Sequence, residues 1–254
     1  MPQIALVTGA AKRIGAAIIK RLHQKNFNVI IHYNQSVNAA KALAKNLNAQ
    51  RKDSAIIIHK NLNLAGLADA KEFIATVYAW HRRLDLVVNN ASVFYANHIL
   101  PTHENYIDGY NPGDWQALFT INVTAPFLLS LAAFPYLRKQ RGVIINLTDI
   151  HSVQPLRHYS IYCQTKAALV MQTKALAREF APLVRVNAIA PGNIMWPEGE
   201  HKLNLAAKKN ILAKIPLQHI GKPENIADAL LTLVSNCYIT GQVLTVDGGR
   251  SIGS

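Results

Sequence analysis

The sequence is poor in cysteine, with only Cys163 and Cys237 among 254 residues and no Cys-x-x-C pair. Two isolated cysteines can neither staple a small secreted fold nor form a zinc-binding pattern, so both classes are excluded and a reducing compartment is expected. Cys163 lies within a helical pattern, which favours a packed side chain over a reactive thiol. The length instead allows a large hydrophobic core, because a chain of this size buries roughly 75% of its unfolded surface.

Acidic residues are scarce as well. The chain has 14 Asp and Glu against 27 Lys and Arg, which gives a formal net charge of +13. Such a surplus attracts anions, including nucleic acid, anionic membranes and acidic small molecules. Apart from Lys12-Arg13, the basic pairs are dispersed along the chain, as is typical of solvated helix faces. We therefore expect a small-molecule partner and no nucleic acid.

No apolar run is long enough to cross a bilayer. The most apolar window, Val123 to Leu137, contains Pro126 and Pro135 and falls short of the ~20 residues that a transmembrane helix needs. The N-terminus leads directly into an apolar run at Ile4, without the basic region or cleavage site of a signal peptide. These features predict a cytoplasmic protein that does not associate with membranes.

A metal site is not expected either, although ten histidines are present. None of them forms a His-x-x-x-His or His-Glu-x-x-His array, which are the patterns that place two ligands on one helix face. His98, His103 and Glu104 fall in one polar segment that is typical of a solvated loop.

Short apolar runs rich in Val and Ile alternate with amphipathic helical patterns, with no repeat or linker between them. This alternation predicts one Rossmann-type α/β domain over residues 1–254, doubly wound, with a seven-stranded parallel sheet flanked by helices. The expected strands are Ile4–Thr8, Asn28–Tyr33, Ala55–His59, Leu84–Asn89, Val143–Thr148, Val184–Ile189 and Val243–Val246. The expected helices are Ile14–Lys25, Asn38–Leu47, Leu67–Trp80, Trp115–Leu137, Tyr159–Phe180 and Pro223–Leu233.

The first expected strand leads into a turn of small residues, Thr8-Gly9-Ala10-Ala11-Lys12-Arg13-Ile14-Gly15. Gly9 allows a tight turn, and the free N–H groups at the following helix start attract a pyrophosphate. The second strand ends without the carboxylate that an NAD enzyme places against the ribose hydroxyl. Arginine and phosphate match in a charge-assisted geometry, so this corner indicates NADPH. Lys12, Arg13, His32 and Ser36 can supply positive charge and hydrogen-bond donors to a 2′-phosphate. The candidate cofactor-binding residues here are Lys12, Arg13, His32, Tyr33, Asn34 and Ser36.

Tyr162 and Lys166 are four residues apart in a helical pattern, which puts both side chains on one face. At about 6 Å and an effective dielectric of about 20, the Lys cation attracts a phenolate by about 2.8 kcal/mol. We therefore expect the pKa of Tyr162 to fall towards the range in which it exchanges a proton at neutral pH.

Further motifs accompany this pair in a fixed order: Thr8-Gly9…Gly15, Asn89-Asn90-Ala91, Asn122, Pro191-Gly192 and Thr240-Gly241-Gln242…Asp247-Gly248-Gly249. Together they resemble the short-chain dehydrogenase/reductase family over essentially the whole chain. The resemblance implies that Tyr162 is the proton donor, that Lys166 holds the nicotinamide ribose and that Asn122 supports a proton relay. It implies a cofactor groove lined by Gly9, Ile14, Asn90, Ala91, Tyr162, Lys166, Pro191, Gly192 and Ile194. Near the adenine, Asn61-Leu62 departs from the family, which usually has an Asp there.

Three departures from the family pattern narrow the function. Asp149 stands where the family usually has a Ser that polarises a ketone, and a carboxylate would repel the negative charge that hydride transfer builds on oxygen. Reduction of C=N leaves a nitrogen that collects a proton, which a carboxylate can assist. Arg13 replaces a small residue, and Ser92 replaces a glycine two positions before Phe94, an aromatic side chain able to stack on a flat heterocycle.

These departures resemble the pteridine reductase branch, which reduces pterins and often folates with NADPH. By that resemblance, Arg13, Ser92, Phe94, Asp149 and Tyr162 contact the substrate, Ser92 also contacts the cofactor, and Asp149, Tyr162 and Lys166 carry protons. The alternative is an NADPH-dependent carbonyl reductase of the same family, such as a 3-oxoacyl-thioester reductase. A non-catalytic NADPH sensor or nucleic-acid binder is a third hypothesis, which the intact Tyr162–Lys166 pair disfavours.

The resemblance also implies a homotetramer, with 115–137 and 159–180 as candidate interface helices. Two long segments, 92–114 and 191–210, are expected to be irregular and to close over the substrate as lids. His98 and Trp196, which lie in these segments, receive no role from the sequence.

Overall fold

The computed structural model describes residues 2–97, 111–196 and 203–252. Its sheet has seven parallel strands in the order β3-β2-β1-β4-β5-β6-β7. The strands are β1 (Ile4–Val7), β2 (Asn28–Tyr33), β3 (Ala55–His59), β4 (Leu86–Asn89), β5 (Val143–Leu147), β6 (Arg185–Pro191) and β7 (Val243–Val246). The strand order reverses direction between β1 and β4, where a doubly wound sheet opens a crevice for ligands.

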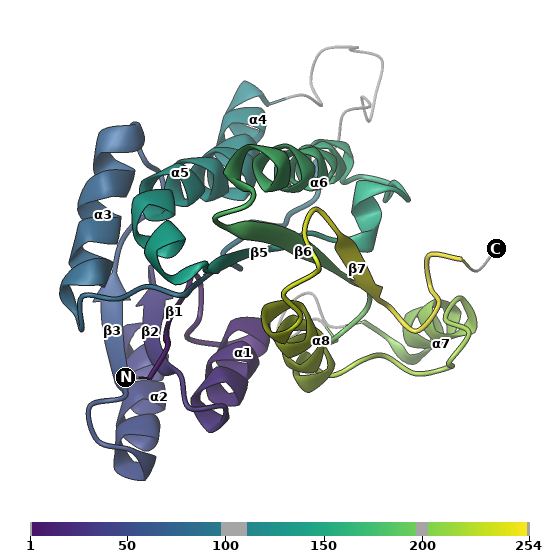
Figure 1. The fold of residues 1–254 in the computed structure, drawn as a ribbon. Helices are drawn as coiled ribbons and strands as arrows, with labels where there is room; N and C mark the ends of the chain where they lie inside the picture. The colour runs from purple at the N-terminus through teal and green to yellow at the C-terminus, as the bar shows by residue number, and fades with distance from the viewer. Residues whose placement is uncertain (1, 98–110, 197–202, 253–254) are drawn as a thin grey trace.

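Helices cover both faces of this sheet (Figure 1). One face packs against α1 (Arg13–Gln24), α2 (Val37–Gln50) and α8 (Pro223–Ser235), and the other against α3 (Leu67–Ala79), α5 (Ala125–Leu137) and α6 (Ser160–Phe180). The central strands are almost wholly inaccessible because both faces are covered, which explains their unbroken Val, Ile and Leu runs. The predicted Rossmann-type α/β fold is confirmed.

Two helical segments differ from the predictions. The helix expected over Trp115–Leu137 begins earlier, as α4 (Pro112–Phe119), because Asn111 caps its start by accepting a hydrogen bond from the Gly113 amide. It continues through a π-helical turn, Thr120–Thr124, before α5. Such turns are rare and occur often at functional sites.

The second difference is helix α7 (Leu205–Ala213), which lies in a segment that the sequence predicts to be irregular. The Asn204 side chain caps its start by accepting from the Ala207 amide, and this cap explains why a helix forms there. The other predicted lid contains residues 98–110, so the expectations for His98, His103 and Glu104 lie outside the described residues.

The expectation that no apolar run is long enough to cross a bilayer is wrong: the continuous helical stretch Pro112–Gln140 is apolar and long enough to span a membrane by composition alone. Half of its most apolar part is buried inside the fold, in the core that α5 shares with α3. It therefore has the character of a core helix.

Candidate active site

The predicted site residues gather at the carboxyl edge of the sheet, where β1, β4, β5 and β6 end. The Thr8 hydroxyl accepts hydrogen bonds from the amides of Asn90 and Ala91, each at 3.0 Å. The Asn90 side chain donates to the carbonyls of Thr8 and Gly9. These bonds fasten the loop after β4 to the turn after β1, across the point where the strand order reverses.

The turn after β1 makes this approach possible through its glycines. Gly9 has φ +61°, and a Cβ there would come within 3.0 Å of the Ala91 Cα. A Cβ on Gly15 would lie 2.6 Å from the Gly9 carbonyl oxygen. Both positions therefore require the absence of a side chain.

The start of helix α1 has the features of an anion site. No side chain caps this end of the helix, and its first turn contains no acidic residue. Lys12 and Arg13 are both exposed there. Because free N–H groups and the helix dipole favour negative charge, this end of the helix fits a phosphate.

Arg13 has the left-handed backbone conformation, with φ +54°. A residue with a side chain pays a conformational cost of about 1–3 kcal/mol there, and such residues cluster at ligand sites. The sequence marks Arg13 as a replacement of a small residue but does not reveal this strain.

His32 does not supply positive charge to the cofactor corner, contrary to the prediction. Its side chain is buried, Nδ1 accepts a hydrogen bond from the Gly9 amide at 3.0 Å, and Nε2 lies 2.9 Å from the Lys60 carbonyl. Burial lowers the pKa of His32 to about 4, so the ring is neutral at pH 7. His32 therefore supports the turn after β1 from within the fold.

The other predicted cofactor-binding residues after β2 and β3 differ in how far their side chains are exposed. Asn34 is exposed, Ser36 and Tyr33 are half-buried, and the Tyr33 ring packs against His59. Near the predicted adenine site, Asn61 is exposed and accepts from the Asn63 amide, while the Leu62 side chain is buried in the core. Leu62 can thus offer only its backbone to a ligand.

The residues after β6 are tightly packed. Pro191 and Ile194 are buried, and Ile14 packs against the same core as Ile194. A Cβ on Gly192 would lie 2.6 Å from the Asp247 Cβ, so the chain segment after β7 leaves room only for glycine.

Helix α6 brings Tyr162 and Lys166 to this edge, and the segment after β5 brings Asp149. The Tyr162 hydroxyl donates to Asp149 Oδ2 at 2.8 Å, and Asp149 Oδ1 accepts from the His151 amide at 2.9 Å. Lys166 is buried, and its Nζ donates to the Leu147 carbonyl at 3.0 Å. The same Nζ lies 5.5 Å from the centroid of the Tyr162 ring. The three predicted proton-carrying residues are therefore neighbours.

The predicted fall in the pKa of Tyr162 is wrong. Burial raises this pKa well above its ordinary value, and the carboxylate of Asp149 raises it further. Burial also lowers the pKa of Lys166 to about 8, against the opposing pull of Asp149. The predicted pKa of Tyr162 depends only on attraction by the Lys cation. In the fold, desolvation and the anion beside the phenol both favour the neutral form. Tyr162 is thus a protonated phenol at neutral pH.

Asn122 lies in the π-helical turn, and its side chain is fully engaged with protein partners. Its oxygen accepts from the Val93 amide and the Ser92 hydroxyl, and its amide donates to the Val93 carbonyl and the Thr165 hydroxyl. These four bonds use its whole hydrogen-bonding capacity. The side chain thus fixes the loop after β4 against α6.

Phe94 forms an aromatic cluster beside the proton-carrying residues. Its ring stacks on Tyr159, with centroids 4.5 Å apart and planes 12° apart, and meets Tyr162 edge-on at 4.7 Å. The Phe94 side chain is 54% exposed, so a flat aromatic surface remains open to a ligand. Sequence reasoning missed Tyr159, although an aromatic residue three positions before Tyr162, at the expected start of the same helix, is a usable signal.

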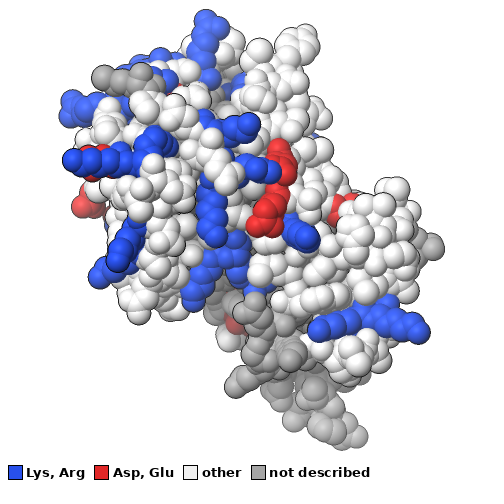
Figure 2. Space-filling view, turned by 90° about the horizontal axis from the view of Figure 1, so that it is seen from below, with Lys and Arg blue, Asp and Glu red and all other residues white. Residues whose placement is uncertain are grey.

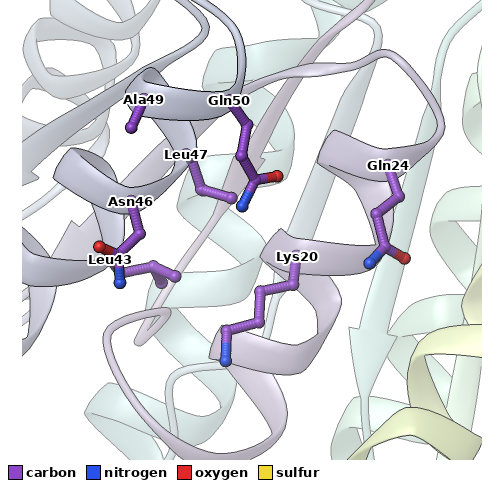
Figure 3. Close-up of a pocket in the computed structure, with 7 residues that line it drawn as sticks. All are labelled: Lys20, Gln24, Leu43, Asn46, Leu47, Ala49 and Gln50. Atoms are coloured by element: carbon purple, nitrogen blue, oxygen red, sulfur yellow. The ribbon is translucent and has the colours of Figure 1, made fainter.

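Two other surfaces stand apart from this site. A groove of about 450 Å³ between α1 and α2 is lined by Lys20, Gln24, Leu43, Asn46, Leu47, Ala49 and Gln50, and contains none of the predicted site residues (Figure 3). The face seen from below in Figure 1 carries Lys and Arg side chains spread widely among few acidic ones (Figure 2).

Trp196 faces Lys208, whose Nζ lies 5.5 Å from the centroid of the Trp196 ring. Within the described ranges, no three His, Cys, Asp or Glu side chains cluster as metal ligands.

The fold and the Tyr162–Lys166 pair define an oxidoreductase with a dinucleotide-binding crevice. The sequence model of a family described as enoyl-(acyl carrier protein) reductase matches residues 9–251. The chain therefore belongs to the short-chain dehydrogenase/reductase family, whose members use NAD(P)H.

Individual relatives match almost the whole chain. Pteridine reductase 1 of Leishmania tarentolae is 33% identical, over 98% of this chain and 96% of the relative. The 3-oxoacyl-[acyl-carrier-protein] reductase of Synechocystis sp. is 34% identical, over 97% and 96%. The reductase FabG of Thermotoga maritima, of the same description, is 32% identical, over 98% of each chain. Identity alone does not separate a pterin from a ketone as substrate.

Proposed function

We propose that this protein is an NADPH-dependent pteridine reductase. Its substrates would be pterins such as biopterin, dihydrobiopterin or dihydromonapterin, with folates as further candidates. The observation that carries the proposal is the hydrogen bond between Tyr162 and Asp149 beside the exposed face of Phe94. This arrangement suits a flat ring whose nitrogen collects a proton.

The chain's residues fit NADPH at the turn after β1. The uncapped start of α1 and the exposed Lys12 and Arg13 favour phosphate groups, and Asn34 and Ser36 add hydrogen-bond donors near the end of β2. Bound NADPH supplies the hydride. The remaining groove candidates are Gly9, Ile14, Tyr33, Asn61, Leu62, Asn90, Ala91, Ser92, Pro191, Gly192 and Ile194.

Tyr162 serves as the proton donor to the substrate nitrogen. Because its pKa is raised, the hydroxyl keeps its proton at neutral pH, and Asp149 Oδ2 orients it at 2.8 Å. When the proton leaves, negative charge develops on the phenol oxygen, and the nearby Lys166 ammonium stabilises it. Asp149 in turn stabilises the protonated nitrogen, a role that it could not perform for a developing alkoxide.

Arg13, Ser92 and Phe94 would hold the substrate. Phe94 offers a planar face next to the proton donor, and stacking of this kind contributes about 0.5–1.5 kcal/mol beyond area burial. The Arg13 guanidinium is exposed at the start of α1, where it can donate to a polar edge of a heterocycle.

The test is direct. Purified protein mixed with NADPH and dihydrobiopterin should consume NADPH, as measured by absorbance at the nicotinamide band. Asp149→Ser and Tyr162→Phe should each lower the rate by about 10²-fold or more, the range for loss of a general acid. Asn48→Ala, at the other edge of the sheet, is the matched control that should retain the rate.

The second candidate is reduction of 3-oxoacyl thioesters, which the names of the Synechocystis and Thermotoga relatives favour. Turnover of acetoacetyl thioesters without turnover of pterins would establish it and would refute the pterin proposal. In that case Asp149→Ser should raise the rate, because a hydroxyl would replace the carboxylate facing the developing oxyanion.

A homotetrameric, cytoplasmic enzyme is also proposed. Apolar side chains remain exposed on the two candidate interface regions, with Trp115 at 39%, Phe127 at 40% and Met171 at 64%. Burial of such a surface between copies would remove it from water. Size-exclusion chromatography with light scattering measures the oligomeric state.

A further inference from the structure

The loop after β4, residues 90–97, is fastened along its length to the elements that form the site. Asn90 holds the turn after β1, and Ser92 and Val93 bond to Asn122. Tyr95 donates to the Asp114 carbonyl in α4. The described part of the loop ends at Asn97, which has not been given any role so far.

Helix α6 lacks a cap of its own. Tyr159 occupies the capping position, and its side chain accepts no hydrogen bond from the first turn. The first amides of a helix have no partner within the helix, so a distant group must satisfy them or water must reach them. Tyr162 lies in this first turn, so the order of the turn determines where the phenol points.

Asn97 supplies the missing cap from the loop. Its Oδ1 accepts from the Ile161 amide at 3.4 Å, and its Nδ2 donates to the Ser160 hydroxyl at 3.1 Å. Its backbone amide donates to the His158 carbonyl at 2.7 Å. The Asn97 side chain is only 4% exposed, so these contacts are made away from bulk water.

The same contacts position the aromatic surface. Phe94 lies three residues before Asn97 and stacks on Tyr159, the residue just before α6. Anchoring the loop at Asn97 therefore fixes Phe94 and Tyr159 relative to each other as well as the start of α6.

We propose that Asn97 is a positioning residue: it caps α6 from the loop after β4 and thereby holds the Phe94–Tyr159 surface in register with Tyr162. Its hydrogen bonds go to the start of α6 and to His158, and we assign it no contact with substrate or cofactor. The inference rests on the reductase activity of this site and not on the identity of its substrate.

The experiment compares Asn97→Ala, Asn97→Asp and Asn48→Ala. Asn48 is the matched control, because its side chain likewise holds backbone amides, those of Ser54 and Ala55, but at the opposite edge of the sheet. Asn97→Asp keeps the acceptor for Ile161 and can accept from the Ser160 hydroxyl. If Asn97→Ala does not fold, Asn97→Ser, which is too short to reach the helix, carries the same comparison.

Two measurements are made on each variant. For Asn97→Ala we expect kcat/KM to fall about tenfold, because small misplacements of reacting groups are costly, and Asn97→Asp should restore most of it. Hydrogen exchange of the peptide containing Ile161 should accelerate in Asn97→Ala alone. Asn48→Ala should lower the melting temperature without changing either quantity.

Unchanged kcat/KM and unchanged exchange in Asn97→Ala would overturn the proposal, as would a loss that Asn97→Asp does not restore. The exchange measurement needs no substrate. If the wild type reduces acetoacetyl thioesters and not pterins, the pterin assignment fails. In that case kcat/KM of the variants is measured with the acetoacetyl thioester as the substrate.

Discussion

Both edges of the sheet bury polar side chains, but they use them differently. At the amino edge, Asp85 accepts a bidentate hydrogen bond from Arg83 and another from the Ile4 amide. At the same edge, the His23 ring bonds to the Ser54 hydroxyl. Each of these groups has partners that satisfy it within the fold.

The carboxyl edge instead holds groups in costly states. Lys166 is a buried ammonium that donates to the Leu147 carbonyl, Tyr162 is a phenol beside a carboxylate, and Arg13 has a strained backbone. Burial is common to both edges, so it does not identify function. The distinguishing sign is that the ionisable side chains of Tyr162, Asp149 and Lys166 lie together beside an exposed aromatic ring.

Lys166→Met gives the largest expected change. We expect activity to fall about 10²-fold or more, since the phenolate loses its cation. The free energy of unfolding of Lys166→Met should nevertheless be higher than that of the wild type near pH 7. The folded pKa of about 8 lies below the ordinary 10.5, so the charged ammonium opposes folding by about 3 kcal/mol at neutral pH.

That penalty should disappear as pH rises from 8 towards 10.5, because the unfolded chain binds more protons in this window. Denaturant unfolding of the wild type and Lys166→Met at pH 7 and pH 10 measures it. Asp85→Asn at the amino edge is the control, which should destabilise the protein and leave kcat unchanged. Equal losses of activity in both variants would remove the distinction between the edges.

His32→Asn tests whether the His32 ring is buried and neutral behind the turn after β1. The folded pKa of His32 is about 4, below the ordinary 6.5, so its contribution to stability is present above pH 6.5 and is lost as pH falls towards 4. The wild type should lose about 3 kcal/mol in this window from His32, and His32→Asn should not.

Denaturant unfolding between pH 4 and 7 provides the comparison. His23→Asn serves as the amino-edge control, since burial lowers the pKa of His23 too. The affinity of His32→Asn for NADPH should differ from that of the wild type at pH 7, but the dependence of this affinity on salt concentration should be the same in both. A reduced salt slope would instead assign His32 a direct charge contact with the phosphate.

Arg13→Gly gives the smallest expected change in stability. Glycine adopts the left-handed conformation freely, so the free energy of unfolding should rise by about 1 kcal/mol. NADPH should bind more weakly because a guanidinium is lost. Arg13→Ala separates the two effects: it should weaken NADPH binding equally but give no gain in stability. Thermal melts and fluorescence titration measure both.

The sequence predicts best what depends on local spacing. Continuous Val and Ile runs locate the strands, and the spacing of four residues places Tyr162 beside Lys166. The contact of Tyr162 with Asp149 follows from the family pattern, but its effect on the pKa depends on burial, which no local pattern reveals.

Two of the missed features depend on distant partners. His32 ends a strand like many polar residues, and only the Lys60 carbonyl and the Gly9 amide make it an internal brace. Asn97 and Ile161 are 64 residues apart, with α4, α5 and β5 between them, so no local spacing relates the two residues. Helix α7 was missed because its pattern is weakly amphipathic and the Asn204 cap was not considered.

The segment after β7 is joined to the segment that follows Asp149. The Asp247 carboxylate accepts from the amides of Gly249 and Ser251, and the Gln154 side chain donates to the Ser251 carbonyl, five residues beyond Asp149. A substitution of Asp247 that loosens this turn would therefore reach, through Gln154, the segment that follows Asp149.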